Sequence, residues 1–238
     1  MKAFKKSFLI IIIFTTSSVS QEIMDFEGSL YPKYSKYLEN ISNDLKNYFV
    51  FNFKTDKKQL VITFDDGPNL NTKKIIAYLA KNNIPATFFL ITSQLNDTSI
   101  EYYNNALFEI GIHSYSHKNF DKISKLEIEN DLKKSVKYHN IKNITTQYFR
   151  TPYGIINKDL KETLKKLNLS GIMWSIDSHD WNSKNSDYIF KKSTQSLKKG
   201  SIILFHDSLK IDLLKRIIKE IYNEGYEIIS LSEALKNN

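Results

Sequence analysis

The stretch Leu60-Val61-Ile62-Thr63-Phe64-Asp65-Asp66-Gly67-Pro68 joins an apolar run of strand length to two adjacent carboxylates and a Gly-Pro break. Successive side chains of a strand point to opposite faces, so two Asp at its end can diverge. One carboxylate is then able to hold a metal while the other handles a proton. Asp, Gly and Pro are also common turn residues, so the stretch alone is equally typical of a solvated turn.

A pair of histidines favours the active-site interpretation. The string His113-Ser114-Tyr115-Ser116-His117 follows a second apolar piece, Phe108–Ile112. With one helical turn between them, both rings can face one cation, and a carboxylate completes the three-ligand set of a hydrolytic site with an open water position. Two histidines at this spacing are often ordinary surface residues. The chain has only five, however, so a pair beside paired carboxylates points to a metal site.

Three further strings complete a resemblance to a known family. They are Arg150-Thr151-Pro152-Tyr153-Gly154, Asp177-Ser178-His179-Asp180-Trp181 and Ile203-Leu204-Phe205-His206-Asp207. Together the five strings resemble the polysaccharide deacetylases, the NodB-homology enzymes of carbohydrate esterase family 4. They occur in the family's order over about 145 residues, from Thr63 to Asp207. A single short motif is a weak signal, whereas five in sequence are specific.

The resemblance implies a metal site and a set of catalytic residues. Asp66, His113 and His117 would bind one divalent metal ion, zinc in first place, although cobalt, nickel or manganese accept the same ligands. Asp65 would be the general base, held by Arg150.

The resemblance also implies a general acid, an oxyanion donor and an acyl pocket. His206 would be the general acid, oriented by Asp180, and Tyr153 would offer its backbone N–H to the oxyanion. Trp181 and Leu204 would form the walls of a small pocket for the acyl methyl group. Three neighbours depart from the usual pattern, Ile112, Lys118 and Thr151, and none of them is a reacting group.

Amide hydrolysis requires the same groups on chemical grounds. A divalent ion lowers the pKa of a bound water and polarises the carbonyl, and a backbone N–H shares the developing charge. A histidine with a carboxylate partner is a natural proton donor to the departing nitrogen. Of the remaining polar residues, we interpret Asp177 as a loop brace or helix cap and His139 as a surface residue. For His179, substrate contact and solvent exposure both stay open.

The chain from residue 60 onward alternates between strand and helix patterns, which predicts an α/β fold with a parallel sheet and right-handed crossovers. Every motif falls at the C-terminal end of a predicted strand, where barrel enzymes assemble their sites. The resemblance implies a distorted (β/α)7 barrel with outer helices. The predicted strands are 60–64, 86–91, 109–113, 147–150, 171–176, 201–205 and 226–230, and the predicted helices are 72–82, 98–108, 124–138, 158–167, 186–197 and 209–224.

The beginning of the chain has the pattern of a secretory signal. The segment 1–6 carries three lysines, and it precedes the apolar run Phe8–Phe14 and small residues up to Ser20. The run is shorter than the ~20 residues that cross a bilayer, so we expect a cleaved signal over 1–20 and no transmembrane span in the mature chain. An uncleaved N-terminal tether is the alternative that stays open. Residues 21–58 form a polar helical extension and residues 59–238 the deacetylase domain. The absence of cysteine excludes a lipoprotein anchor and a disulfide framework.

The net charge and the predicted export limit the possible functions. The formal charge is +8, and removal of Lys2, Lys5 and Lys6 leaves +5, which suits acidic envelope surroundings or serves solubility. No nucleic-acid motif is present, so we exclude nucleic acid as a partner. We therefore predict a monomeric hydrolase of the periplasm or exterior of a bacterium. It would remove N-acetyl groups from N-acetylhexosamines of an envelope or extracellular glycan, such as peptidoglycan or chitooligosaccharide.

Three other functions stay open at this point. A glycan-binding envelope protein could keep the site without turnover. A deacylase could act on a lipid-linked amino sugar, and a formyl group would fit the same pocket as an acetyl group. A metal hydrolase of small cyclic amides is disfavoured by export.

Overall fold

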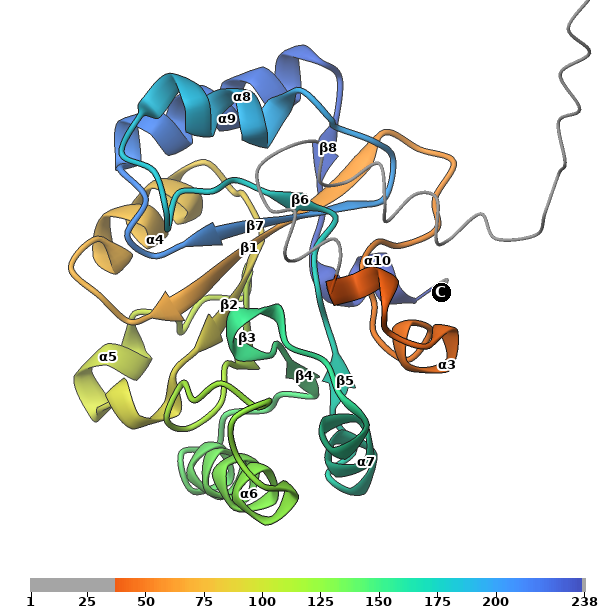
Figure 1. The fold of residues 1–238 in the computed structure, drawn as a ribbon. Helices are drawn as coiled ribbons and strands as arrows, with labels where there is room; N and C mark the ends of the chain where they lie inside the picture. Colours follow the sequence, from red (N-terminus) through yellow and green to blue (C-terminus); the bar gives the residue numbers. More distant parts are fainter. Residues whose placement is uncertain (1–36, 237–238) are drawn as a thin grey trace, which may run out of the picture.

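A computed structural model describes residues 37–236. Its core is a single parallel sheet in the order β5-β4-β3-β2-β1-β7-β6, with β8 paired to β1. Helices surround this sheet, which curls into an incomplete barrel (Figure 1). The prediction of an α/β fold built as a distorted seven-stranded barrel is confirmed. The strands are β1 (Gln59–Gly67), β2 (Ala86–Leu90), β3 (Phe108–Ile112), β4 (Tyr148–Phe149), β5 (Ser170–Gly171), β6 (Ile176–Asp177), β7 (Ser201–His206) and β8 (Glu227–Ile228).

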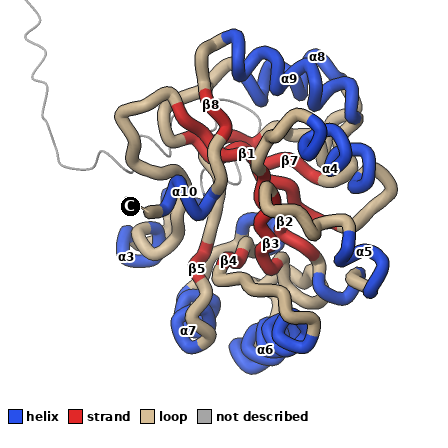
Figure 2. Tube along the Cα trace, turned by 180° about the vertical axis from the view of Figure 1, so that it is seen from behind, coloured by secondary structure: helices blue, strands red, loops and turns tan. Residues whose placement is uncertain are grey.

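Helices follow most of the strands. Figure 2, seen from behind, shows α4, α8 and α9 grouped on one side of the sheet and α6 and α7 at its other end. The helices are α3 (Asn43–Lys46), α4 (Thr72–Lys81), α5 (Asp97–Glu101), α6 (Lys125–Ile141), α7 (Lys158–Lys166), α8 (Ser186–Thr194), α9 (Ile211–Asn223) and α10 (Leu231–Leu235), with short 3₁₀ turns η2 (Thr92–Gln94) and η3 (Pro152–Gly154).

Strand β1 shows how the sequence pattern divides the core. Leu60, Ile62 and Phe64 pack in the cluster between sheet and helices, whereas Val61 packs in the cluster inside the barrel. This alternation follows from the period of two along a strand. Both faces are buried because helices cover one and the barrel interior covers the other, which explains the continuous apolar run. The same alternation places Thr63 and Asp65 on the interior face.

The predicted strand 171–176 is two short strands instead of one. Gly171 pairs with β4, whereas Ile176 pairs with β7 at the other edge of the sheet. Between them the chain crosses the open side of the barrel, where the Val50 carbonyl accepts from the Met173 N–H at 2.7 Å. The prediction was wrong about a single regular strand, because the sheet is open here and the partner of this segment comes from the N-terminal extension.

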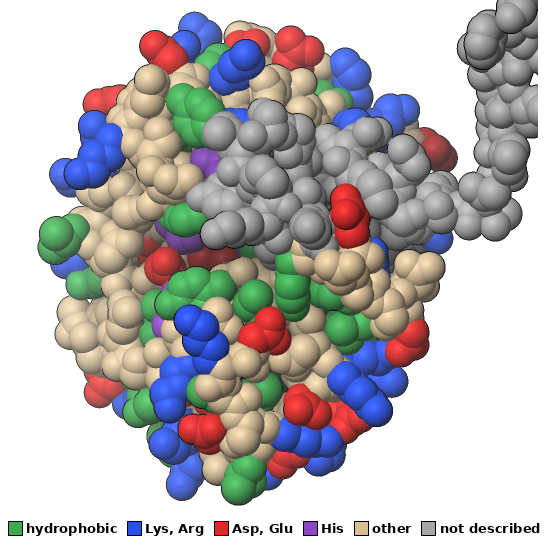
Figure 3. Space-filling model, viewed as in Figure 1, with side chains coloured by type: hydrophobic (Ala, Val, Ile, Leu, Met, Phe, Trp, Pro, Cys, Tyr) green, Lys and Arg blue, Asp and Glu red, His purple; other side chains and the backbone are tan. Residues whose placement is uncertain are grey.

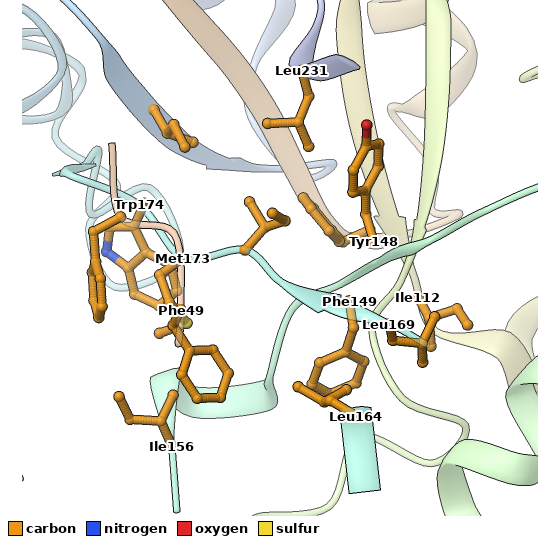
Figure 4. Packing of buried hydrophobic residues seen from close by; sticks show 14 of the residues in the cluster. Phe49, Ile112, Tyr148, Phe149, Ile156, Leu164, Leu169, Met173, Trp174 and Leu231 are labelled. Atoms are coloured by element: carbon orange, nitrogen blue, oxygen red, sulfur yellow. The ribbon is translucent and has the colours of Figure 1, made fainter. Parts of the chain in front are cut away.

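The described part of the extension fills this opening. Phe49, Phe51 and Phe53 are buried in the interior cluster, and Phe49 lies against Ile156 and Met173 in Figure 4. The Phe53 N–H donates to the Gly200 carbonyl at 2.9 Å. Gly200 has φ of +79°, and a Cβ there would meet the Phe53 oxygen at 1.8 Å, so only glycine fits.

Helix lengths also differ from the prediction in one place. The predicted helix 98–108 ends at Glu101, and Tyr103 turns inward to pack on Phe88 with ring centroids 5.1 Å apart. The other predicted helices are present with ends shifted by a few residues. Helix α9 is amphipathic and buries Leu213, Leu214, Ile217, Ile218 and Ile221 against the sheet.

Candidate active site

The two adjacent carboxylates lie at a bulge where β1 ends. The register between β1 and β2 shifts between Asp65 and Gly67, and Asp66 has φ of +69°. A bulge re-aims the side chains around it. As a result Asp65 and Asp66 line the same cavity, instead of pointing to opposite faces as regular alternation would require. Asp65 is buried and Asp66 is partly exposed.

His113 follows β3 and is held from two sides. Its backbone N–H donates to the Leu90 carbonyl at 2.9 Å, and its ring Nδ1 lies 2.9 Å from the Arg150 carbonyl oxygen. A carbonyl can only accept, so Nδ1 carries the proton and the Nε2 atom faces the cavity. This second hydrogen bond fixes the ring orientation and tautomer, as is usual for histidines that bind metals.

His113, His117 and Asp66 converge on one point. The Asp66 Oδ1 atom lies 3.4 Å from His113 Nε2 and 3.2 Å from His117 Nε2. Single ligand atoms of the three residues all lie within 4.8 Å of one another. Burial opposes ionisation of Asp66, but the two imidazoles outweigh it and hold its pKa well below the usual range. The carboxylate is therefore anionic at neutral pH.

The donor set fits a divalent cation. If the rings are neutral, the Nε2 lone pair of His113 faces the Asp66 oxygen, and two electron-rich atoms oppose each other. If the rings are protonated, they supply the missing positive charge themselves. The neutral arrangement therefore needs a cation at its centre, and two imidazoles with one carboxylate are ligands that zinc accepts.

Asp65 is held by a buried guanidinium. Arg150 is fully buried, and its Nη1 donates to Asp65 Oδ1 at 2.9 Å and to Thr63 Oγ1 at 2.6 Å. Its Nε and Nη2 donate to the carbonyls of Ile172 and Met173. The guanidinium thereby makes these four hydrogen bonds, and such pairing is the condition for burying the charge. The Oδ2 atom of Asp65 faces the cluster of Asp66, His113 and His117, and it lies 3.8 Å from His113 Nε2.

His206 pairs with Asp65 in the register of β7 on β1 and enters the cavity from the other strand. Asp180 Oδ1 lies 2.8 Å from His206 Nδ1, and Asp180 Oδ2 accepts from the His206 backbone N–H at 2.8 Å. Burial alone would lower the pKa of His206. The Asp180 carboxylate outweighs burial, with help from Asp65 and Asp66, and raises the pKa of His206 to about 9. The imidazole is therefore protonated at neutral pH.

These residues border a cavity of about 280 Å³. Figure 3 shows a hollow on this face in which histidine and acidic side chains are visible. The predicted wall residues Trp181 and Leu204 line it, and Tyr153 lines it with a half-exposed ring 4.8 Å from the His117 ring. Tyr153 has φ of +59° within η3. The structure thus brings eight of the ten predicted residues to one cavity, with Arg150 and Asp180 directly behind Asp65 and His206.

Four lining residues lie outside the ten predicted ones: Thr151, Gly154, Trp174 and Asp177. Trp174 is a wall of the cavity, and its ring centroid lies 5.6 Å from the Arg150 guanidinium. An aromatic residue near the end of a predicted strand was the available signal, because such ends meet at the barrel's C-terminal face.

The residues outside the main assignments have mixed outcomes. Asp177 braces its loop, because its Oδ1 accepts from the His179 N–H at 2.8 Å and from Trp181 Nε1 at 3.3 Å. His179 is buried, which excludes the exposed alternative. The surface assignment of His139 was wrong, because this side chain is 1% exposed and burial lowers its pKa to about 4. The surface assignment followed from the lysines near His139 in the sequence, which gave no sign that α6 buries this face.

Asp207 follows His206 but points to the opposite face of β7. It is fully buried, accepts hydrogen bonds from the Thr72 hydroxyl and from the Tyr103 hydroxyl at 3.4 Å, and its pKa is raised by burial to about 7. Its carboxylate also lies directly over Gly67, where a Cβ would meet it at 2.3 Å. Asp207 thus packs between β1, β7 and α4, behind the site.

A curled parallel sheet that gathers two histidines and an aspartate beside a second carboxylate and a protonated imidazole defines a metal-site α/β barrel. The chain belongs to the polysaccharide deacetylase family, whose model matches residues 52–172. The resemblance inferred from the five strings is thereby confirmed.

Individual relatives agree with this family. A peptidoglycan-N-acetylglucosamine deacetylase, PgdA, of Listeria monocytogenes is 31% identical over 189 residues, which is 76% of this chain and 39% of the relative. The peptidoglycan-N-acetylmuramic acid deacetylase PdaC of Bacillus subtilis is 30% identical over 75% of this chain and 39% of its own length. The matched region therefore spans about two fifths of these relatives. A crystal structure of a peptidoglycan N-acetylglucosamine deacetylase superimposes with a TM-score of 0.73 at 26% identity, covering 85% of this chain and 97% of that one.

Proposed function

We propose that this protein is a metal-dependent hydrolase that removes N-acetyl groups from N-acetylhexosamine residues of an envelope or extracellular glycan. The observation that carries the proposal is that Asp65 and His206, neighbours on β1 and β7, line one cavity beside the cluster of Asp66, His113 and His117. A hydrolysis of this kind needs a general base for the water and a general acid for the leaving group, both within reach of the same substrate. His206 is protonated at neutral pH, and Asp65 is paired with Arg150.

The proposed roles follow from the free atoms of each residue. A metal ion held by the cluster would acidify a bound water and polarise the acetyl carbonyl. Arg150 occupies Asp65 Oδ1, so Oδ2 is the atom that takes the proton of the attacking water. Asp180 occupies His206 Nδ1, so Nε2–H is the donor to the departing nitrogen. The C–O bond forms, the C–N bond breaks, and the products are acetate and a free amine.

The cavity suits a small acyl group. Leu204, Trp174 and Trp181 provide apolar walls for a methyl, and the backbone N–H of Tyr153 is the proposed second donor to the oxyanion. The half-exposed rings of Tyr153 and Trp181 border the same cavity, where a sugar ring can lie against them. Peptidoglycan is the first candidate glycan, because the relatives above are named for its two amino sugars. Chitooligosaccharide is the second, from a deacetylase of Sinorhizobium fredii that is 27% identical.

We propose zinc as the native metal on the basis of the two imidazoles and one carboxylate. We also propose export from a bacterial cell, supported by the cell-wall substrates in the relatives' names. The predicted signal over 1–20 lies outside the described residues. Within residues 37–236, no helix has the length and apolar character to cross a membrane. The monomeric state stays a prediction, to be checked by size-exclusion chromatography with light scattering.

The domain division is likewise a proposal, although part of the extension packs inside the barrel. The extension over 21–58 and the deacetylase domain over 59–238 are separate in sequence pattern. Phe49, Phe51 and Phe53 nevertheless belong to the interior cluster, and the family match begins at residue 52. We therefore expect removal of residues 21–58 to unfold the barrel.

The function is tested by acetate release from a panel of N-acetylglucosamine oligomers and peptidoglycan fragments. Release that requires zinc or cobalt and is abolished by a chelator supports the proposal. Undiminished release by an Asp66→Ala variant would refute it. The binding-only alternative predicts glycan affinity without acetate release in the wild type, and the presence of the base and all three ligands argues against it.

A further inference from the structure

The loop between the two histidine ligands has a strained backbone. Ser114 has φ of +65° and His117 has φ of +54°, and both are left-handed values that cost a non-glycine residue energy. Within the loop, Ser114 Oγ accepts from the His117 N–H at 2.8 Å. Such a conformation persists only where surrounding contacts enforce it.

His113 is anchored without the help of this loop. Its backbone bonds to Leu90 and its ring to the Arg150 carbonyl, and the residue is buried. His117 is more exposed, with a quarter of its side chain accessible, and its ring lies between Asp66 and Tyr153. The position of His117 therefore depends on the loop that carries it.

A carboxylate from α6 holds the middle of this loop. Asp131 is only 7% exposed, and its Oδ1 accepts from the Tyr115 N–H at 2.6 Å while its Oδ2 accepts from the Ser116 hydroxyl. One helical turn further along, Lys134 lies over the Tyr115 ring at 5.5 Å. Both oxygens of this buried carboxylate thus bind the two residues directly before His117.

We propose that Asp131 is a positioning residue for the metal site: it fixes the Ser114–His117 loop so that the His117 ring meets Asp66 and His113. The inference rests on the metal site of the proposed function. Residues that hold ligands in place from behind commonly change metal affinity about 10-fold or more when they are replaced. Asp131 lies outside the five sequence strings, in the middle of a polar helix, so no motif marks it.

The test is zinc affinity of the metal-stripped protein, measured by competition with a chromophoric chelator. We expect Asp131→Ala to weaken zinc binding by about 10-fold or more. Asp131→Asn should restore most of it, because the amide keeps an oxygen for the Tyr115 N–H and its nitrogen can donate to Ser116. The matched control is Glu129→Gln, which removes an acid of the same helix that pairs with Lys166 at 2.5 Å. This control should bind zinc as the wild type does.

A folded Asp131→Ala variant with wild-type zinc affinity would overturn the proposal. If that variant does not fold, Ser116→Ala decides the question, because Ser116 is exposed and its replacement removes one of the two bonds. Weaker binding supports the positioning role, and unchanged binding contradicts it. The readout is independent of deacetylation. Failure of the wild type itself to bind zinc would instead contradict the metal site of the proposed function.

Discussion

Replacement of Asp180 with Asn should lower the pKa of His206 from about 9 to about 7, so that about half of the imidazole is neutral at pH 7. The carboxylate oxygen 2.8 Å from His206 Nδ1 stabilises the imidazolium, whereas burial opposes it. An Asn amide group at this place can donate to Nδ1 and so favours the neutral ring. Loss of an opposite charge at this distance changes a pKa by about 1 to 3 pH units.

The magnitude follows from the pKa itself. His206 is raised from 6.5 to about 9, and each pH unit corresponds to about 1.4 kcal/mol, so the folded protein favours the imidazolium by about 3 kcal/mol. Because the folded pKa is raised, this stabilisation is fully present below pH 6.5 and is lost as the pH rises through about 9. The Asp180→Asn variant should lack this contribution, so its unfolding free energy should vary less between these pH values.

The assay is an NMR titration of ¹³C-labelled histidine in the metal-free protein. The chain has five histidines, and His206→Gln identifies the signal. We expect a pKa of about 9 in the wild type and a fall of about two pH units in Asp180→Asn. Turnover at pH 8 should fall by about 10-fold, because a pKa near 7 leaves only about a tenth of His206 protonated there. A wild-type pKa near 6.5, or an unchanged pKa in Asp180→Asn, would refute the reasoning.

Three other substitutions test separate parts of the account. Replacement of Arg150 with Met leaves Asp65 buried beside an apolar chain, and urea denaturation should show a loss of about 3 to 5 kcal/mol. Replacement of Trp181 with Ala opens one wall of the cavity, so the ratio of propionyl to acetyl release should rise by about 10-fold in a competition assay. Replacement of Glu109 with Ala leaves the first two N–H groups of α10 without their acceptor, and the unfolding free energy should fall by about 1 to 3 kcal/mol with turnover unchanged.

Each of these has an outcome against it. Wild-type stability in Arg150→Met would mean that the ion pair adds nothing to the fold. An unchanged acyl preference in Trp181→Ala would remove this residue from the pocket. If Glu109→Ala stays folded at the assay temperature but loses turnover, α10 contributes to the active site and not only to stability.

The site could be predicted because its residues lie in short strings at strand ends. Parallel strands bring their C-terminal ends to one edge, so Asp65, His113 and His206 meet although they are far apart in sequence. Their roles stay predictions until activity is measured. The bulge at Asp66 could not be predicted, because it depends on the register of β1 against β2.

The errors in the fold have a common cause, which is long-range contact. Residues 171–176 have the composition of one strand, but Met173 pairs with Val50 across the open side of the barrel. His139 lies among lysines in sequence, and the packing of α6 buries it. Asp131 carries no local signal, since its partners are a backbone N–H and a hydroxyl in another loop. Sequence periodicity reports a residue's own element and not what another segment brings to it.

The most direct test of the central claim is a zinc titration of the metal-stripped protein, followed by acetate release from N-acetylglucosamine oligomers or peptidoglycan fragments. We expect activity to be absent without metal, to rise with added zinc and to saturate at one equivalent per chain, matching the single cluster of Asp66, His113 and His117 in the described residues. Asp66→Ala should stay inactive at every zinc concentration. Full acetate release by the metal-stripped protein, or restoration of Asp66→Ala by one equivalent of zinc, would contradict the account.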